Sequence, residues 1–199
     1  MSSFIGHSLA ALSTYYVEKQ PPSRNTRYWL GWLIIVGSAP DVDHIIPALH
    51  LTYQYQDVRI SHSIVLSLVL PIGTILLLTL LGCKGRSRII RSQQVILAGL
   101  SHLVLDLLTG VNKLPLLWPF SNEIFKLPFG ILPSAGGVNL FNYFLYRNLL
   151  IEMGVLAPLV YIAFLMSHDK SNTRQQKVLI GGLLVISICL MVWSFSLRR

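Results

Sequence analysis

Long apolar runs separated by short basic stretches define the pattern of this chain. The clearest run extends from Ile60 to Gly82, and two others cover Leu149–Met166 and Val178–Leu197. Each is close to the roughly 20 residues that an α-helix needs to cross the hydrocarbon core of a membrane. These runs therefore predict membrane-spanning helices, the last of them at 178–197.

Three further apolar segments are shorter or interrupted. Residues 4–17 are too few to span a membrane upright, Trp29–Ala39 ends in a Pro-Asp-Val-Asp-His break, and Gln94–Gly110 is predicted to be a helix. The stretches between the segments are predicted to be loops: 18–28, 48–60, 83–93, 111–148 and 167–177. The pattern predicts an all-α polytopic membrane bundle of about five to six membrane segments.

Composition supports one integral membrane domain over residues 1–199. Charged residues make up 12% of the chain, against about 25% in soluble domains. No polar linker is long enough to separate two domains, and residues 1–6 lack the basic region of a signal peptide. Cys83 and Cys189 have neither the spacing of a disulfide framework nor that of a zinc knuckle.

The net charge of +8 is explained by membrane topology, so no nucleic-acid partner is expected. Loops 18–28, 83–93 and 167–177 hold ten Lys and Arg residues, which favours placing them in the cytoplasm. The terminal Arg198-Arg199 argues mildly against this orientation. With both termini outside, the ionisable residues of the apolar segments lie near the extracytoplasmic face.

Those ionisable residues are the candidate site, because charged groups at membrane depth are costly and mark function. His102 and Asp106 share one helix face at i and i+4. Asp41 and Asp43 flank one residue after Pro40, where two close carboxylates need a cation between them. The candidate metal ligands are His7, Asp41, Asp43, His44, His62, His102, Asp106 and Glu152.

This ligand set suits Zn²⁺ best, with Mn²⁺ or Fe possible, and we expect two or more ions. Paired metals favour hydrolysis by an activated water, with Asp41, Asp43, His102, Asp106 and Glu152 as the catalytic residues. Two alternatives remain open. The same metal site could be structural or sensory in a non-catalytic protein that scaffolds a partner. A metal or proton transporter is disfavoured because the acidic groups gather at one end.

Purely structural roles of single residues also remain open. His7 and His44 could be satisfied structural groups, and Glu152 could pair with Arg147. His50 and His168 lie in a loop and on the opposite side, outside the candidate site. In the long loop, aromatic residues could either anchor the interface or cover the site and admit a lipid sideways: Trp118, Phe120, Phe125 and Phe129.

Five short motifs occur in a characteristic order: His7 in Gly-His-Ser, Ala-Pro-Asp-Val-Asp-His at 39–44, Ser-His-Ser at 61–63, His102-x-x-x-Asp106, and Leu-Trp-Pro-Phe-Ser at 117–121. Over about residues 1–160 the chain resembles the YdjM family of inner-membrane proteins, described as metal-dependent hydrolases and as LexA-binding. In one departure, Ile60 separates Arg59 from the Ser-His-Ser motif, where family members often have an adjacent basic residue.

The resemblance implies a bacterial or archaeal membrane protein with phospholipase-like or phosphoesterase-like activity, and hence a membrane lipid as substrate. It also suggests kinship with all-helical zinc-dependent phospholipases C, in which a His-x-x-x-Asp pair supplies metal ligands. Here that pair is His102 and Asp106, with Glu152 as a late acidic ligand. A protein partner is possible but unspecified.

Overall fold

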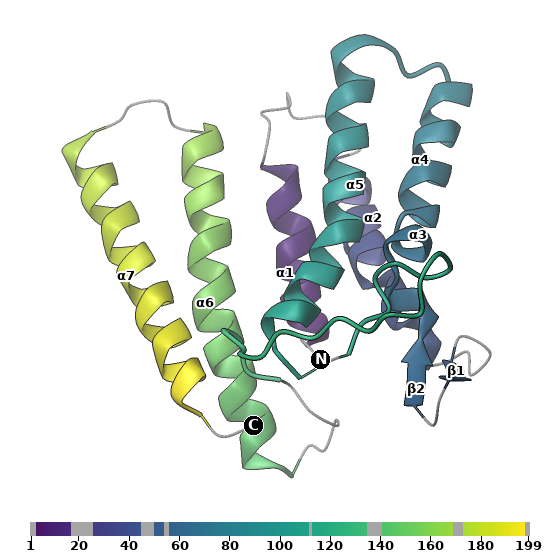
Figure 1. Ribbon diagram of the computed structural model, residues 1–199. Helices are drawn as coiled ribbons and strands as arrows, with labels where there is room; N and C mark the ends of the chain where they lie inside the picture. Colours follow the sequence, from purple (N-terminus) through teal and green to yellow (C-terminus); the bar gives the residue numbers. More distant parts are fainter. Residues whose placement is uncertain are drawn as a thin grey trace.

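The fold was analysed in a computed structural model of the chain. It describes residues 3–16, 26–44, 50–53, 56–111, 113–134, 141–168 and 173–197. The elements are α1 (Phe4–Tyr15), α2 (Thr26–Ser38), η1 (Ala39–His44), β1 (His50–Tyr53), β2 (Gln56–Arg59), η3 (Ile60–His62), α3 (Ile64–Ser67), α4 (Val69–Leu80), α5 (Gly85–Leu108), α6 (Tyr143–His168) and α7 (Arg174–Ser196). The described residues thus form a helical bundle with one short hairpin (Figure 1).

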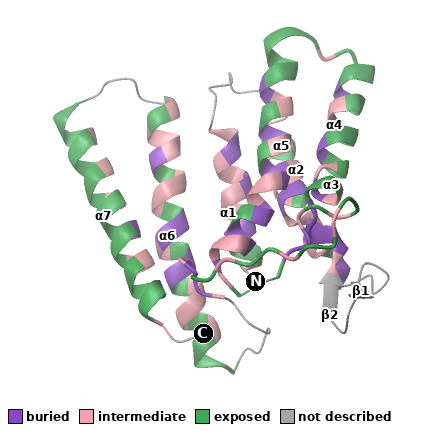
Figure 2. Cartoon of the chain, viewed as in Figure 1, coloured by how far each residue is buried: buried purple, intermediate pink, exposed green. Residues whose placement is uncertain are grey.

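Helix α1 lies in the middle of this bundle. It packs against α2 and α5 on one side and against α6 on the other, while α7 contacts the rest mainly through α6. Figure 2 shows the consequence: buried residues gather on α1, α2, α5 and one side of α6, whereas α7 is exposed along most of its length. Exposed apolar residues on a helix of this length are expected where lipid is the solvent.

A small apolar core holds α1, α2 and α5 together through Ala11, Leu33, Val36, Val95 and Ala98. Small residues allow these helices to approach closely. A Cβ atom on Gly37 would lie 2.6 Å from the Cβ of Ala11. At Gly99 it would lie 2.8 Å from both Pro71 Cγ and the carbonyl oxygen of Ser67. The close packing brings one end of each helix to a common point.

Within the described residues, two helices are long and apolar enough to cross a membrane: Tyr143–Ser167 and Arg174–Ser196. They contain the run predicted at 149–166 and all but the last residue of the run predicted at 178–197. The third predicted run, Ile60–Gly82, is divided. Its helical part covers Ile64–Leu80 and changes from α3 to α4 at Leu68. Pro71 has no N–H to donate to the carbonyl of Ser67, which explains the break.

All five predicted loops contain residues of helices or strands, including the first residues of α2 in 18–28 and of α7 in 167–177. The polar residues 85–93 belong to α5, because no Pro or further Gly between 86 and 93 interrupts the helix. Helix α6 begins at Tyr143, inside the predicted loop 111–148. The predicted loop 48–60 contains the antiparallel β1–β2 pair, in which His50 lies opposite Arg59. This hairpin returns the chain to η3 and places Arg59 beside η1.

Candidate metal centre

Five of the predicted ligands come together. The elements that carry them meet at the end of the bundle opposite the α4–α5 turn (Figure 1). His7 lies on α1, Asp41 on η1, His62 on η3, and His102 and Asp106 on α5. All except Asp41 are fully buried. Residues nearly a hundred positions apart in the sequence are therefore neighbours in the fold, which is the arrangement that a metal centre requires.

The break after α2 sets the position of Asp41. Helix α2 ends at Ser38 and tightens into the 3-10 turn η1, in which Pro40 supplies no backbone donor. At the same place, His102 Nδ1 lies 2.8 Å from the carbonyl oxygen of Gly37. A carbonyl can only accept, so Nδ1 carries the proton and the Nε2 lone pair of His102 faces the cluster.

Two groups of three residues offer ligand atoms close enough to hold a metal ion: His62, His102 and Asp106, and His7, Asp41 and His102. The Nε2 atoms of His62 and His102 lie 3.2 Å apart. From these two nitrogens, Asp106 Oδ2 lies 3.3 and 3.9 Å away, and Asp41 Oδ1 lies 3.5 and 3.7 Å away. Zinc bonds of about 2.0–2.1 Å in a tetrahedron separate two ligands by roughly 3.3–3.4 Å. The distances of His62 Nε2 to His102 Nε2, Asp106 Oδ2 and Asp41 Oδ1 are close to this value, and the distances of the two carboxylate oxygens to His102 Nε2 are longer.

His7 forms a second group with the other oxygens of the same carboxylates. Its Nε2 lies 3.6 Å from Asp106 Oδ1 and 3.8 Å from Asp41 Oδ2. The ring stacks on that of His102, with centroids 3.8 Å apart. Neither ring nitrogen of His7 makes a hydrogen bond to the described part of the chain. Because a buried unsatisfied donor or acceptor is costly, the His7 nitrogens indicate a missing partner such as a cation.

Asp43 lies beside the cluster rather than inside it. Its carboxylate accepts hydrogen bonds from Arg59 and from Ser61 Oγ, the latter at 2.8 Å. Its Oδ2 also lies 3.5 Å from Nδ1 of His62, on the far side of the ring from the other ligands. A carboxylate in this position orients a metal-binding imidazole and raises its basicity.

The carboxylates produce an excess of negative charge at the two turns. Burial alone would raise the pKa of Asp43, but contacts with His62, Arg59 and Ser61 lower it well below its usual range. Burial lowers the pKa of His62, but Asp106, Asp41 and Asp43 outweigh burial and raise this pKa to about 10. The cluster therefore attracts positive charge to the position between these groups, where a divalent cation would compete with the proton.

Two predicted ligands lie elsewhere or outside the described side chains. Glu152 on α6 is buried, but its carboxylate accepts from the backbone N–H of Ser3 at 3.0 and 3.1 Å. It therefore binds the N-terminus of α1, one turn before His7, and belongs to neither ligand group. His44 ends η1, and its side chain lies outside the described residues.

Sequence reasoning missed the role of Arg59. Its guanidinium binds Asp43 and also lies 3.4 Å from Asp41 Oδ1. The available signal was its place directly before the Ile60-Ser61-His62 turn, since an arginine so close to a candidate ligand offers charge to the same site. The intervening Ile60 concealed this, because the 3-10 geometry of η3 is not readable from the residues alone.

Comparison with known families decides the relationship of the chain. The sequence model of the YdjM inner membrane protein family matches residues 1–198. The chain belongs to the YdjM family. The resemblance predicted over residues 1–160 thus extends across α6 and α7, and the chain is a membrane protein. Comparisons with curated proteins and with solved structures each gave no match.

Proposed function

We propose that this chain is a metal-dependent hydrolase of a bacterial or archaeal inner membrane, acting on a phosphate ester in a lipid-like substrate. About five to six segments would lie in the membrane, with α6 and α7 crossing it. The metal centre would lie near the extracytoplasmic face, because the cluster is at the end opposite Lys84, Arg86 and Arg88. The donor set suits Zn²⁺, or Mn²⁺ or Fe.

The observation that carries the proposal is the double use of two carboxylates. Asp41 and Asp106 each turn one oxygen toward His62 and the other toward His7. Such sharing suits two adjacent cations, of which the one beside His7 has three protein donors. A site with three protein ligands retains a position for water or substrate, as catalytic zinc sites do. Paired cations supply an activated water and stabilise the charge on phosphoryl oxygens.

Asp41 and Arg59 form the part of the proposed site that a substrate can reach, and Arg59 adds a positive charge there. Asp41 is the exposed member of the ligand set, with 20% of its side chain accessible, and Arg59 beside it is 18% accessible. The planar guanidinium of Arg59, fixed by Asp43, keeps a positive charge at this opening. Arginine in such a place binds phosphate oxygens well, which favours a phosphate ester over an uncharged ester.

A structural or sensory metal site is the second candidate, and burial favours it. His7, His62, His102 and Asp106 all have fully buried side chains, as the ligands of closed structural sites do. The exposed edge at Asp41 and Arg59 is the observation against it. The two candidates differ in whether a substrate reaches the cations.

Activity assays on purified protein separate the two candidates. The full chain in detergent is supplied with Zn²⁺ or Mn²⁺ and incubated with a panel of phospholipids and lipid phosphates, and released phosphate or diacylglycerol is measured. Hydrolysis that disappears on chelation and in Asp106→Asn supports the hydrolase. Bound metal without hydrolysis of any substrate in the panel supports the structural or sensory site and contradicts the hydrolase.

A further inference from the structure

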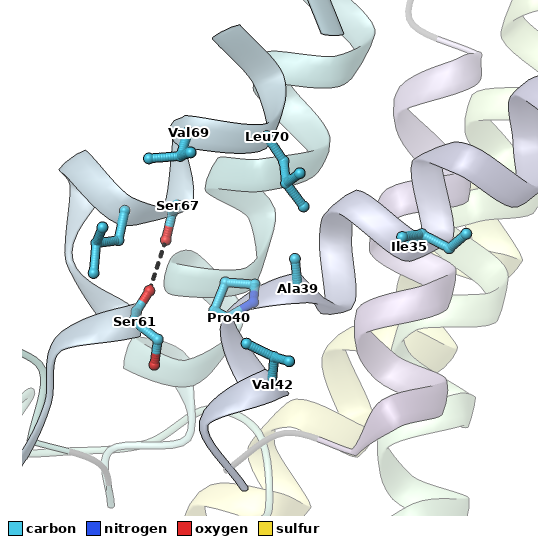
Figure 3. Close-up of a pocket in the computed structure, with 9 residues that line it drawn as sticks. Ile35, Ala39, Pro40, Val42, Ser61, Ser67, Val69 and Leu70 are labelled. Atoms are coloured by element: carbon cyan, nitrogen blue, oxygen red, sulfur yellow. Dashed lines mark hydrogen bonds between the residues drawn. The ribbon is translucent and has the colours of Figure 1, made fainter. Parts of the chain in front are cut away.

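A largely apolar groove of about 390 Å³ lies on the outside of the bundle beside the metal centre. Figure 3 shows its two walls: α2 and η1 contribute one, and η3, α3 and α4 contribute the other. Its apolar lining comes mainly from Ile35, Ala39, Val42, Leu66, Val69 and Leu70. The volume lies within the range of about 300–1,000 Å³ typical of small-molecule sites.

One end of the groove coincides with the turns that carry the candidate ligands. Pro40 and Val42 of the lining flank Asp41, and Ser61 precedes His62. The hydroxyl of Ser61 binds the Asp43 carboxylate, and the hydroxyl of Ser67 donates to the Ser61 carbonyl at 3.4 Å (Figure 3). Both serine hydroxyls are therefore engaged with the protein, so the remaining contact surface of the groove is hydrocarbon.

The groove thus leads from a hydrocarbon surface toward a charged site. Its occupant should therefore have an apolar part in the groove and a charged part at that site. Next to this end of the groove, outside its lining, lie the guanidinium of Arg59 and the candidate cation ligands, a set complementary to a phosphate. A transmembrane helix is a poor fit: at about 10 Å across it needs roughly 400 Å³ for each turn. A single acyl chain is thin enough to lie within the groove.

We infer that this groove binds one acyl chain of a membrane phospholipid, with the phosphate of that lipid directed to Arg59 and the metal centre. The lipid enters from the bilayer, because Ile35, Val69 and Leu70 of the groove are exposed on the surface of the bundle. The inference rests on the proposed function for the fate of the phosphate, but not for the binding of the chain. It assigns the substrate a diacyl lipid rather than a soluble phosphate ester.

Photo-crosslinking tests the groove directly. The full-length protein is incorporated into nanodiscs that contain phosphatidylglycerol with a diazirine in one acyl chain, irradiated and digested, and the labelled peptides are identified by mass spectrometry. We expect label on the peptides that contain residues 35–42 and 64–70. Filling the groove by Leu70→Trp should reduce this label about tenfold, since even one methylene of pocket contact changes affinity roughly tenfold or more.

Leu77→Trp is the matched control, because Leu77 is the same residue type two turns along the same face of α4 and outside the groove. It should retain the label. Thermal unfolding of the same samples shows whether each variant keeps its fold, and Val69→Trp replaces Leu70→Trp if that variant is unfolded. Label spread evenly over the lipid-facing helices, equal label in both tryptophan variants, or crosslinks that join two copies of the chain through the groove would overturn the inference.

Hydrolysis measured in parallel separates the two proposals. Asp106→Asn should lose phosphate release and retain the acyl label, because the groove does not include Asp106. Groove label without phosphate release in the unmodified protein supports the groove and contradicts the proposed hydrolase. Phosphate release from phosphatidylglycerol without groove label contradicts the groove and leaves the hydrolase standing.

Discussion

Helices α6 and α7 are long and apolar, whereas most of the helices around the candidate metal centre are short. α6 and α7 have 26 and 23 residues, against 12 in α1, 13 in α2 and 12 in α4. At 1.5 Å per residue, a helix of 12 residues covers only about 18 Å of a hydrocarbon core roughly 30 Å thick.

The polar groups of the two regions differ in the same direction. Between α6 and α7, the hydroxyl of buried Ser187 donates to the carbonyl of Val155, so its hydrogen bond is made within this helix pair. In the cluster region, His7, His102 and Asp106 are buried with nitrogen and oxygen atoms turned toward one another. Irregular backbone at membrane depth persists only where protein or a polar cavity satisfies it. The comparison shows that the turns η1 and η3 carry Asp41 and His62 of the candidate site, whereas α6 and α7 are the candidate membrane spans.

Removing a shared carboxylate should have the largest effect. Asp106→Asn keeps the size of the side chain but removes the charge that both ligand groups share, so hydrolysis should fall about 100-fold or more. Ser187→Ala, which alters only the α6–α7 hairpin, should leave hydrolysis within twofold of the unmodified protein. Equal activity of the two variants would contradict the assignment of hydrolysis to the ligand cluster rather than to the α6–α7 pair.

Removing the orienting carboxylate should have an intermediate effect. Asp43→Asn leaves the ligand atoms in place but weakens the support of His62 and leaves Arg59 with a neutral partner. Metal affinity, measured by competition with a chelating dye, should fall roughly 10- to 100-fold. An unchanged affinity would mean that Asp43 only joins η1 to η3.

Packing offers a test that does not involve metal. In Gly99→Ala the new methyl group meets Pro71 and the Ser67 carbonyl at 2.8 Å, and overpacking of this kind costs about 1–3 kcal/mol. In Gly181→Ala on α7 nothing lies within 4 Å, so stability should be unchanged or rise by up to about 1 kcal/mol. Thermal unfolding of both variants in detergent measures the difference, and equal melting temperatures would contradict the close packing of α4 on α5.

Acid should reveal the smallest effect. The folded-state pKa of Asp43 lies below the unfolded value of 3.8, so its contacts stabilise the protein at neutral pH and lose that contribution as the pH falls below 3.8. Between pH 7 and pH 3, the melting temperature of the unmodified protein should fall more steeply than that of Asp43→Asn. Parallel curves would contradict a stabilising role of the ionised carboxylate.

The sequence predicted the two long apolar helices and the His102–Asp106 pair of the candidate site because both depend on local patterns. The apolar runs at 149–166 and 178–197 are confirmed as helices long enough to span, and the His102–Asp106 spacing places both residues on one face of α5. The division of Ile60–Gly82 was not predicted, although Pro71 within the run is the sequence feature that explains it.

Contacts between distant segments were equally out of reach. Asp41 and Asp43 are two residues apart, and nothing in the sequence indicates that one faces the ligand cluster while the other faces Arg59. Glu152 was grouped with the ligands because it is an acidic residue in an apolar helix. Its partner, the N–H of Ser3, is 149 residues away and becomes visible only when α1 packs on α6.

Metal content of the purified chain tests the central claim most directly. Elemental analysis should find two divalent ions per chain in the unmodified protein and in Ser187→Ala. It should find one in His7→Ala, which loses a ligand of the second group only, and none in Asp106→Asn, which loses the carboxylate common to both. Metal content that is the same in all four proteins would contradict a metal centre built from His7, Asp41, His62, His102 and Asp106.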